Sequence, residues 1–264
     1  SKLSFAQIDI MIIKDIFNCT IDWQCIDLQK LILDKVPKEQ YAYLFNKDDQ
    51  LYNWGHVLHQ VMRSDQRDMG KLLLSAIEND KQLMVRDIYG LYVIPRGMLQ
   101  GSTKVMKLVL DRMKSNPQLI TEQLYGCDSG GYRGFYYAFS YKRTECAMKV
   151  IKYLKDDQLH IPLNEAAKQD KELSLVPMLL SHASSDKARY KLLHERNEKG
   201  QTLLSVAINF NRRQLVEWLL DEYKDSDSVF TQPDSEMHTT PIQYLAKKDD
   251  TFADILEAML FKLS

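Results

Sequence analysis

The clearest hydrophobic pattern lies in residues 200–220, GQTLLSVAINFNRRQLVEWLL. Thr202 is a good N-cap residue, because its hydroxyl can accept a hydrogen bond from a backbone N–H of a first helical turn. Apolar residues then recur at helical spacing up to Ile208, polar residues interrupt them at 209–211, and the apolar pattern resumes at Leu215. The stretch therefore predicts two short helices joined by a turn. Such a pair is too small to bury its own apolar face, so we expect it to stack on copies of itself.

Similar units occur elsewhere in the chain. Thr240-Pro241-Ile242 repeats the capping Thr and places Pro at a first helical position, where it is well tolerated. Pro162-Leu163 followed by Ala166-Ala167 repeats the helix start and the small pair. The predicted units begin, at separations of 28 to 41 residues, near Trp54, Gly90, Gly131, Leu159, Gly200 and His238. Spacing of this size indicates a repeat array.

These units resemble the ankyrin repeat, whose frame is G-x-T-P-L-x-x-A-A, a turn, and V-V-x-x-L-L. No unit carries the full T-P-L-H-x-A-A string, and Leu203 stands where Pro is usual. The resemblance implies an all-α fold, an ankyrin-like helical-repeat solenoid of five to six helix pairs. The alternative is another helical solenoid, with longer helices and without hairpin-like fingers.

The first 50 residues do not match the repeat frame. Apolar residues form one helical stripe between Phe5 and Phe17 and another between Leu28 and Leu33. A solenoid needs an atypical unit over its terminal apolar face. We therefore expect residues 1–50 to be a helical N-terminal cap and residues 51–264 to be the repeat array.

Three segments between predicted helix pairs are long: 115–131, 184–200 and 224–238. The ankyrin resemblance implies that such segments form extended fingers along one edge of the stack. They are expected to be either recognition loops or divergent connections.

Composition describes an ordinary solvated protein. The 264 residues are 45% hydrophobic and 27% charged with a net charge of −1, which gives no overall attraction to nucleic acid or membrane. The cysteine spacing fits neither a metal knuckle nor a disulfide framework, which favours a reducing compartment. No apolar run reaches the ~20 residues needed to span a bilayer. We expect a cytoplasmic protein; arrays of this composition also resemble those of secreted bacterial effectors, for which the host cytoplasm is expected.

Candidate catalytic and metal-binding residues are few. The string Asp128-Ser129-Gly130-Gly131 is shared with chymotrypsin-like proteases, whose chemistry needs a β-barrel and a positioned His and Asp. Cys127 has no base in its local sequence. His56 and His59 share a helix face, but His59 occupies a position where ankyrin repeats favour a His that hydrogen-bonds backbone. We expect no catalytic residue, no metal and no cofactor.

An aromatic and basic run, YRGFYYAFSYKR, occupies residues 132–143. It holds more rings than one short helix can bury, so some rings are expected to face outward, where Tyr and Arg commonly anchor protein interfaces. The first functional hypothesis is therefore a protein-interaction module, a scaffold or adaptor acting as a monomer through a concave face and loops. The alternatives are an enzyme on a helical-repeat body and a helical array that binds nucleic acid.

The ankyrin resemblance implies which residues contact a partner. Positions flanking the opening Gly lie on a finger, and positions after the small pair lie at the exposed end of the first helix. The residues at these positions, four of them tyrosines of the three early units and most of the later ones lysines, are Tyr52, Asn53, Arg63, Tyr89, Gln100, Tyr132, Tyr141, Lys168, Gln169, Lys199, Phe210, Lys247 and Lys248. We expect an aromatic half and a basic half, suited to a protein segment with apolar anchors beside acidic residues.

Overall fold

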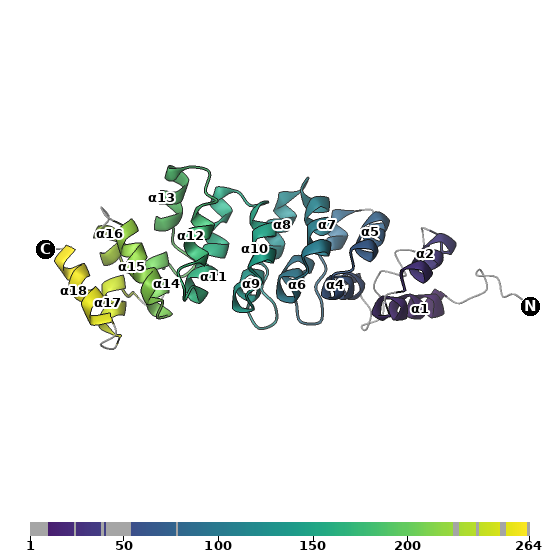
Figure 1. Cartoon of the computed structure of the whole chain (residues 1–264), viewed down its shortest axis with the longest axis horizontal. Coiled ribbons are helices and arrows are strands. Elements are labelled where there is room, and N and C mark those ends of the chain that lie inside the picture. The colour runs from purple at the N-terminus through teal and green to yellow at the C-terminus, as the bar shows by residue number, and fades with distance from the viewer. Residues whose placement is uncertain are drawn as a thin grey trace, which may run out of the picture. The chain divides into compact units, whose positions relative to one another are not determined.

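The computed structural model describes residues 10–23, 25–37, 40, 54–77, 79–223, 227–235, 238–248 and 252–262. These residues form α-helices, short 3₁₀ helices and turns, with no strand among them, so the all-α prediction is confirmed. The chain divides into two compact units, Ser1–Tyr153 and Leu154–Ser264. Within each unit, successive helices pair and stack (Figure 1).

The first unit contains the helices of three complete pairs and of the N-terminal region. They are α1 (Ile10–Asp22), α2 (Ile26–Lys35), α4 (Trp54–Ser64), α5 (Arg67–Ala76), η3 (Asp80–Leu83), α6 (Val93–Gln100), α7 (Thr103–Met113), α8 (Pro117–Tyr125), α9 (Gly134–Ser140) and α10 (Thr144–Ile151). The first helices of the pairs, α4, α6 and α9, pack side by side, and the second helices α5, α7 and α10 do the same. This is the stacking that the hydrophobic pattern predicts.

Glycines allow the first helices of this unit to approach closely. A Cβ atom at Gly97 of α6 would lie 2.9 Å from Sδ of Met62, and one at Gly134 of α9 would lie 3.1 Å from Cα of Pro95. Real Cβ atoms rarely come so close to other heavy atoms, so the spacing between α4, α6 and α9 depends on these two residues.

The N-terminal helices α1 and α2 stack like a further helix pair, because α1 packs on α4 and α2 packs on α5. The predicted helical stripes are only partly buried. Ile13 and Phe17 are buried, whereas Ile12 and Ile16 are exposed. The start of the first stripe, at Phe5, lies outside the described residues.

The second unit contains three further pairs. Its helices are η4 (Asp156–Gln158), α11 (His160–Gln169), α12 (Leu175–Leu180), α13 (Asp186–His194), α14 (Leu203–Asn209), α15 (Arg213–Glu222), α16 (Asp227–Thr231), α17 (Pro241–Ala246) and α18 (Ala253–Lys262). The first helices α11, α14 and α17 pack side by side. The six pairs that follow α2 agree with the predicted five to six.

The predicted helix starts of this unit hold at two of three positions. Thr202 accepts a hydrogen bond from the N–H of Ser205, and Thr240 forms a reciprocal capping box with Gln243. Helix α11 begins at His160, two residues before the predicted start at Pro162. Pro is tolerated in a first turn because the N–H that it lacks has no partner within the helix there.

Each of the three long connections contains an additional helix, α8, α13 or α16, before a short turn, so the extended fingers that the sequence predicted do not fill these segments. Pro117 begins α8, and Leu119, Ile120 and Leu124 are buried on one of its faces. The hydroxyl of Ser185 caps α13 by accepting from the N–H of Ala188. These segments bury apolar residues and are therefore part of the packed structure. No helix in the described part of the chain combines the length and the hydropathy that a membrane span requires.

Candidate functional site

Four hairpin turns, called fingers here, precede first helices in the described part of the chain. Finger 1 is 87–91, finger 2 is 128–132 and finger 3 is 197–201; finger 4 lies between Asp234 and Thr239, of which residues 234–235 and 238–239 are described. In fingers 1 to 3 the N–H of the opening Asp or Asn donates to the carbonyl of the fifth residue, and the N–H of the fourth residue, a Gly, donates to the carbonyl of the opening residue. The Oδ1 atom of the opening residue also accepts from the N–H groups of the third and fifth residues. Asp and Asn suit this turn because their short side chains bond the backbone close by.

The fourth position of each short finger requires a left-handed backbone. Gly90, Gly131 and Gly200 have φ angles of 80°, 81° and 72°. Glycine has no Cβ and adopts this conformation with little strain. In the longer finger 4, His238 takes a φ of 49°. These four residues are the positions at which the sequence placed repeat starts.

The fingers of each unit are joined in a pair. The N–H of Ser129 in finger 2 donates to the carbonyl of Tyr89 in finger 1 at 2.9 Å. In the second unit, the N–H of Ser235 in finger 4 donates to the carbonyl of Lys199 in finger 3 at 3.0 Å. These backbone hydrogen bonds hold the fingers without involving the exposed rings of Tyr89 and Tyr132.

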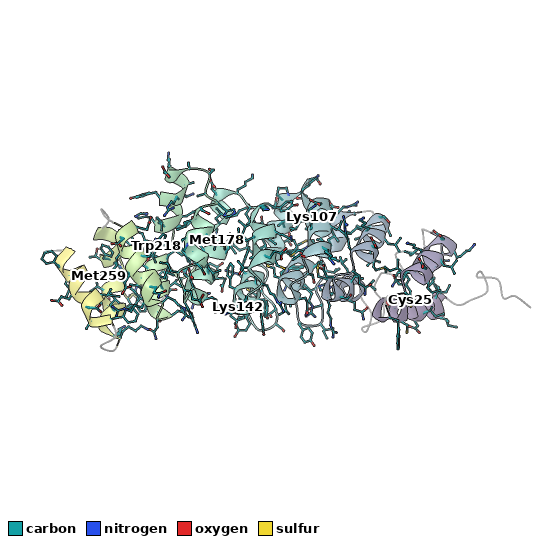
Figure 2. All side chains as sticks on the ribbon, in the orientation of Figure 1. Cys25, Lys107, Lys142, Met178, Trp218 and Met259 are labelled. Carbon is teal, nitrogen blue, oxygen red and sulfur yellow. The ribbon has the colours of Figure 1, made fainter. Side chains whose placement is uncertain are left out.

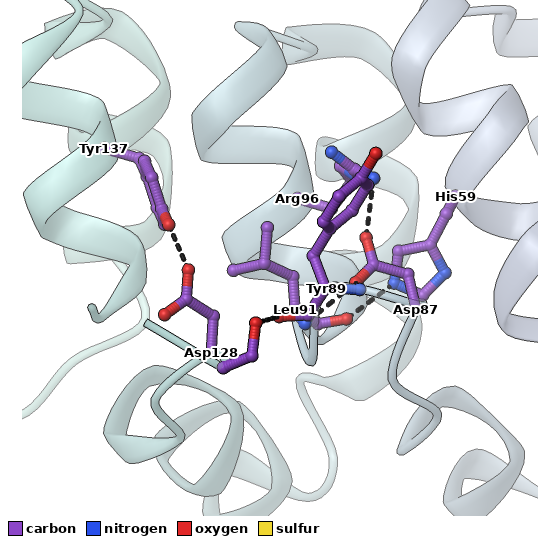
Figure 3. A network of polar contacts seen from close by, with 8 residues as sticks. His59, Asp87, Tyr89, Leu91, Arg96, Asp128 and Tyr137 are labelled. Carbon is purple, nitrogen blue, oxygen red and sulfur yellow. Dashed lines mark hydrogen bonds and ion pairs between the residues drawn. The ribbon is translucent and has the colours of Figure 1, made fainter. Parts of the chain in front are cut away.

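The second carboxylate oxygen of an opening Asp contacts the fourth residue of the following helix. Asp87 forms an ion pair with Arg96 at 2.7 Å, and the Tyr137 hydroxyl donates to Asp128 (Figure 3). In finger 4, the Tyr244 hydroxyl donates to Oδ2 of Asp234 at 2.5 Å. Each of these contacts fixes a finger on its helix.

Two ionisable groups of finger 2 are shifted by this arrangement. Burial acts to raise the pKa of Asp128, but hydrogen bonds from the Tyr137 hydroxyl and from backbone N–H groups outweigh it and lower the pKa below its ordinary value. Burial, together with the hydrogen bond to Asp128, raises the pKa of Tyr137. At neutral pH the pair is therefore an ionised carboxylate that accepts from a neutral phenol.

A groove of about 650 Å³ lies between fingers 1 and 2 and the first helices of the first unit. Its lining combines aromatic and apolar residues with charged and polar ones. The lining residues are Arg63, Tyr89, Leu91, Arg96, Leu99, Gln100, Asp128, Ser129, Gly130, Tyr132 and Tyr137. Tyr89 and Tyr132, on opposite fingers, are 55% and 46% exposed. Its volume falls in the range of ligand pockets.

The charged side chains in this groove differ in whether they already have a partner within the unit. Arg96 is bound to Asp87, and its guanidinium also lies over the ring of Tyr89, 5.3 Å from the centroid. Asp128 is occupied by Tyr137 and the backbone of finger 2. Arg63 is exposed near the end of α4. Among the described residues that line it, the groove therefore presents one accessible cation, Arg63, beside tyrosine rings.

The structure places four predicted contact residues of the first unit in this groove: Arg63, Tyr89, Gln100 and Tyr132. Tyr141, 57% exposed, is not in the groove lining, but its ring stacks on that of Tyr137 at 6.4 Å. Tyr52 and Asn53 lie outside the described residues. Arg96, Asp128 and Tyr137 were not among the predicted contact residues. The available signal was the D-x-x-G string that opens fingers 1 and 2, because the residue nine positions after each of its aspartates is Arg96 or Tyr137.

The predicted contact residues of the second unit lie where the repeat frame implies. Lys199 is on finger 3, and the others are at the ends of first helices: Lys168, Gln169, Phe210, Lys247 and Lys248. Phe210 is 42% exposed. Lys168 is paired with Glu165 at 2.7 Å, and Lys248 donates to the carbonyl of Asn209 at 3.0 Å. The ammonium of Lys247 lies over the ring of Tyr244, 6.0 Å from its centroid, so these three lysines all have contacts within the unit.

The candidate catalytic residues have structural contacts. Asp128 shapes finger 2, and the hydroxyl of Ser129 donates to the carbonyl of Tyr89 at 3.0 Å. The thiol of Cys127 lies 3.9 Å from the carbonyl of Tyr125, a group that cannot act as a base. His59 is buried, and its Nε2 lies 2.9 Å from the carbonyl of Leu91, which is the backbone contact the resemblance implied. The side chain of His56 lies outside the described part of the structure.

The described part of the structure contains no candidate metal site and no disulfide. No group of three or more His, Cys, Asp or Glu side chains there could hold a metal ion. All four cysteines are free thiols; Cys25, for example, is exposed at the start of α2 (Figure 2). Burial raises the pKa of the Cys146 thiol to about 11.

Comparison with solved structures shows the fold. The ankyrin repeat domain of Bcl-3, a member of the IkappaB protein family, matches with a TM-score of 0.61 and 16% identity over 91% of this chain and 97% of that chain. A chain in the structure of the Bd0816 predatory endopeptidase from Bdellovibrio bacteriovorus in complex with immunity protein Bd3460 matches with a TM-score of 0.51 and 15% identity, over 82% of this chain and 100% of that chain. No protein-family model and no curated protein matches the sequence.

Proposed function

We propose, because this chain has the ankyrin-repeat fold, that it is a protein-interaction module whose first-unit groove holds a segment of a partner protein. Ankyrin repeat domains are known as interaction modules, and the fold alone does not supply a partner. The groove supplies the second part of the argument. Its fingers and first helices come from separate repeats, so their exposed side chains converge on one surface.

The observation that carries the proposal is the position of Tyr89 and Tyr132. Both rings are about half exposed on fingers that are held by their own backbone hydrogen bonds, above the apolar side chains of Leu91 and Leu99. Large rings on a rigid support lose little conformational entropy on binding, and Tyr is among the residues that most often dominate interface energy.

The charge of the groove indicates the chemistry of its partner. Arg63 is exposed, whereas Arg96 and Asp128 are already paired within the unit. A partner segment with an apolar anchor for the tyrosines and a carboxylate for Arg63 fits this surface. We expect the lysines and Phe210 of the second unit to form a separate basic surface. The expected assembly is one copy of this chain with another protein, without nucleic acid or cofactor.

The test begins with selection of peptides from a random display library on the full-length chain. The tightest peptide is then titrated against the Tyr89→Ala and Tyr132→Ala double variant, which we expect to bind more than about ten-fold more weakly with an unchanged Tm. Tyr190→Ala is the matched control, because Tyr190 is an exposed tyrosine of the second unit that is absent from the groove. Equal affinity of the wild type and the double variant would place the interface elsewhere, on α8, α13 or α16 or on the N-terminal helices.

A further inference from the structure

One arginine in each unit fastens its two fingers together. Arg86 immediately precedes finger 1, and its Nη1 donates to the carbonyl of Gly90 at 2.8 Å and to that of Cys127 at 2.5 Å. Arg196 immediately precedes finger 3, and its Nη1 donates to the carbonyls of Gly200 at 2.6 Å and Pro233 at 3.1 Å. Each arginine thus bonds the end of its own finger and the residue before the opening Asp of the next finger.

The surroundings of Arg86 hold its guanidinium in place. The group lies over the ring of Tyr92, 4.1 Å from the centroid. Gly126 lies against both groups: a Cβ atom there would lie 2.5 Å from the ring of Tyr92 and 3.1 Å from Nη2 of Arg86. Only a glycine leaves this space for the two stacked groups. A stacked guanidinium with fixed donors loses less freedom per hydrogen bond than a lysine would.

Only one finger of each pair has such an arginine. The residues that precede fingers 2 and 4 are Cys127 and Pro233, whose backbone carbonyls accept from the arginine of the preceding finger. Between α10 and α11, the chain forms the 3₁₀ helix η4 in place of a finger. In the described part of the chain the fingers therefore occur as two separate pairs, and the arginine before each first finger bonds the residue before the second finger.

We infer that Arg86 is a positioning residue for the first-unit groove, and that Arg196 has the same role for the fingers of the second unit. By fastening finger 2 to finger 1, Arg86 sets the separation between Tyr89 and Tyr132 without lining the groove itself. The expected effect of Arg86 on partner binding rests on the function proposed above. The expected effect of Arg86 on the position of the fingers rests on the hydrogen bonds alone.

The experiment compares Arg86→Ala, Arg86→Lys and Arg112→Ala in the full-length chain. Arg112 is the matched control, because it also bonds a carbonyl of the first unit, that of Ile77 at 3.0 Å, together with Asp80, and it lies outside the groove. The first measurement is hydrogen exchange at the amide of Ser129, which bridges the two fingers. The second is the affinity for the library-selected peptide.

We expect Arg86→Ala to accelerate exchange at Ser129 by about ten-fold and to weaken peptide binding by about ten-fold, since both the finger and the tyrosine become free to move. Arg86→Lys should give an intermediate result, and Arg112→Ala should change neither. Unchanged exchange at Ser129 in Arg86→Ala would overturn the inference, and so would faster exchange with unchanged affinity. Failure of the wild type to bind any peptide would contradict the proposed function, while exchange at Ser129 would still decide whether Arg86 fastens the fingers.

Discussion

The fingers of the two units differ in what they present, although fingers 1 to 3 share one set of backbone hydrogen bonds and finger 4 is closed by the N–H of Asp234 donating to the carbonyl of Thr239. In the first unit both opening residues are aspartates, and each binds the following helix through its second oxygen, at Arg96 or Tyr137. In the second unit finger 3 opens with Asn197, whose amide donates instead to the side chain of Gln201 at 3.2 Å. The corresponding helical position there is Val206, which has no hydrogen-bonding side chain.

This difference separates two tasks of the opening residue. The turn itself needs only one acceptor oxygen, which Asn supplies as well as Asp. The negative charge is needed only where the next helix offers Arg or Tyr. The first unit uses that charge in both fingers to organise a groove with aromatic walls. In the second unit, finger 3 keeps the turn without the charge and exposes Lys199, whereas Asp234 of finger 4 keeps the charge and accepts from the Tyr244 hydroxyl.

The largest expected effect comes from a charge buried among the first helices. Ala207 of α14 is fully buried, so Ala207→Asp should unfold the second unit, at a cost above about 4 kcal/mol for an unpaired charge. Ala246→Asp, on the exposed end of α17, should cost less than about 1 kcal/mol. Urea unfolding followed by circular dichroism measures both, and similar midpoints for the two variants would contradict this packing.

Substitutions of two glycines distinguish the cost of backbone strain from the cost of disturbing the contact between paired fingers. Gly131 and Gly200 have similar positive φ angles, but a Cβ at Gly131 would meet nothing within 4 Å, whereas one at Gly200 would lie 2.6 Å from the backbone nitrogen of Ser235. Gly131→Ala should therefore cost about 1–2 kcal/mol from the left-handed conformation alone. Gly200→Ala should cost about 1–3 kcal/mol more from the clash between fingers 3 and 4. Equal losses of unfolding free energy would mean that the fingers of the second unit are not closely paired.

These glycines also show which features of the fold could be predicted from the sequence. The repeat frame placed unit starts at Gly90, Gly131, Gly200 and His238, because a residue that permits a left-handed turn leaves a signal in one position. Arg86 and Arg196 left no comparable signal, since each bonds a carbonyl 41 or 37 residues away. A contact with a backbone atom constrains no residue type at the distant position.

The helices α8, α13 and α16 were missed for a different reason. Their apolar residues are few and the segments are short, so turn-forming residues at their ends dominated the pattern. Tyr223 illustrates what sequence could not supply, because its hydroxyl donates to the carbonyl of Leu193 at the end of α13. Only tertiary packing shows that this connection is part of the core.

The charge of Asp128 gives a smaller, pH-dependent effect. Its pKa is lowered in the folded protein, so its contribution is present above the unfolded pKa of about 4 and is lost as the pH falls through the folded value. Asp128→Asn keeps the turn, as Asn197 does, and should reduce the free energy of unfolding at pH 7 by about 1 kcal/mol. Chemical unfolding at pH 7 and pH 3 should show this difference shrinking at the lower pH. A difference that stays constant or grows would show that the charge is not what Tyr137 stabilises.

The smallest expected effect is that of replacing Cys127, and the buried Cys146 provides its contrast. Cys127 is half-buried beside finger 2, so Cys127→Ser should change the free energy of unfolding and the peptide affinity very little, by less than about 0.5 kcal/mol. Cys146 is buried in α10, and Cys146→Ser should cost about 1–3 kcal/mol if the new hydroxyl finds no partner. Covalent trapping of a substrate on Cys127 would contradict its structural role.

The most direct test of the central claim, that the first pair of fingers forms the binding site, is site-specific photo-cross-linking. A benzoylphenylalanine is placed at position 132 in one sample of the full-length chain and at position 190 in another, and each is irradiated with the library-selected peptide. Both positions carry exposed tyrosines, but only Tyr132 lines the groove. The account predicts a cross-linked product from position 132 and none from position 190. A product from position 190 alone would place the partner on α13 of the second unit and contradict the claim.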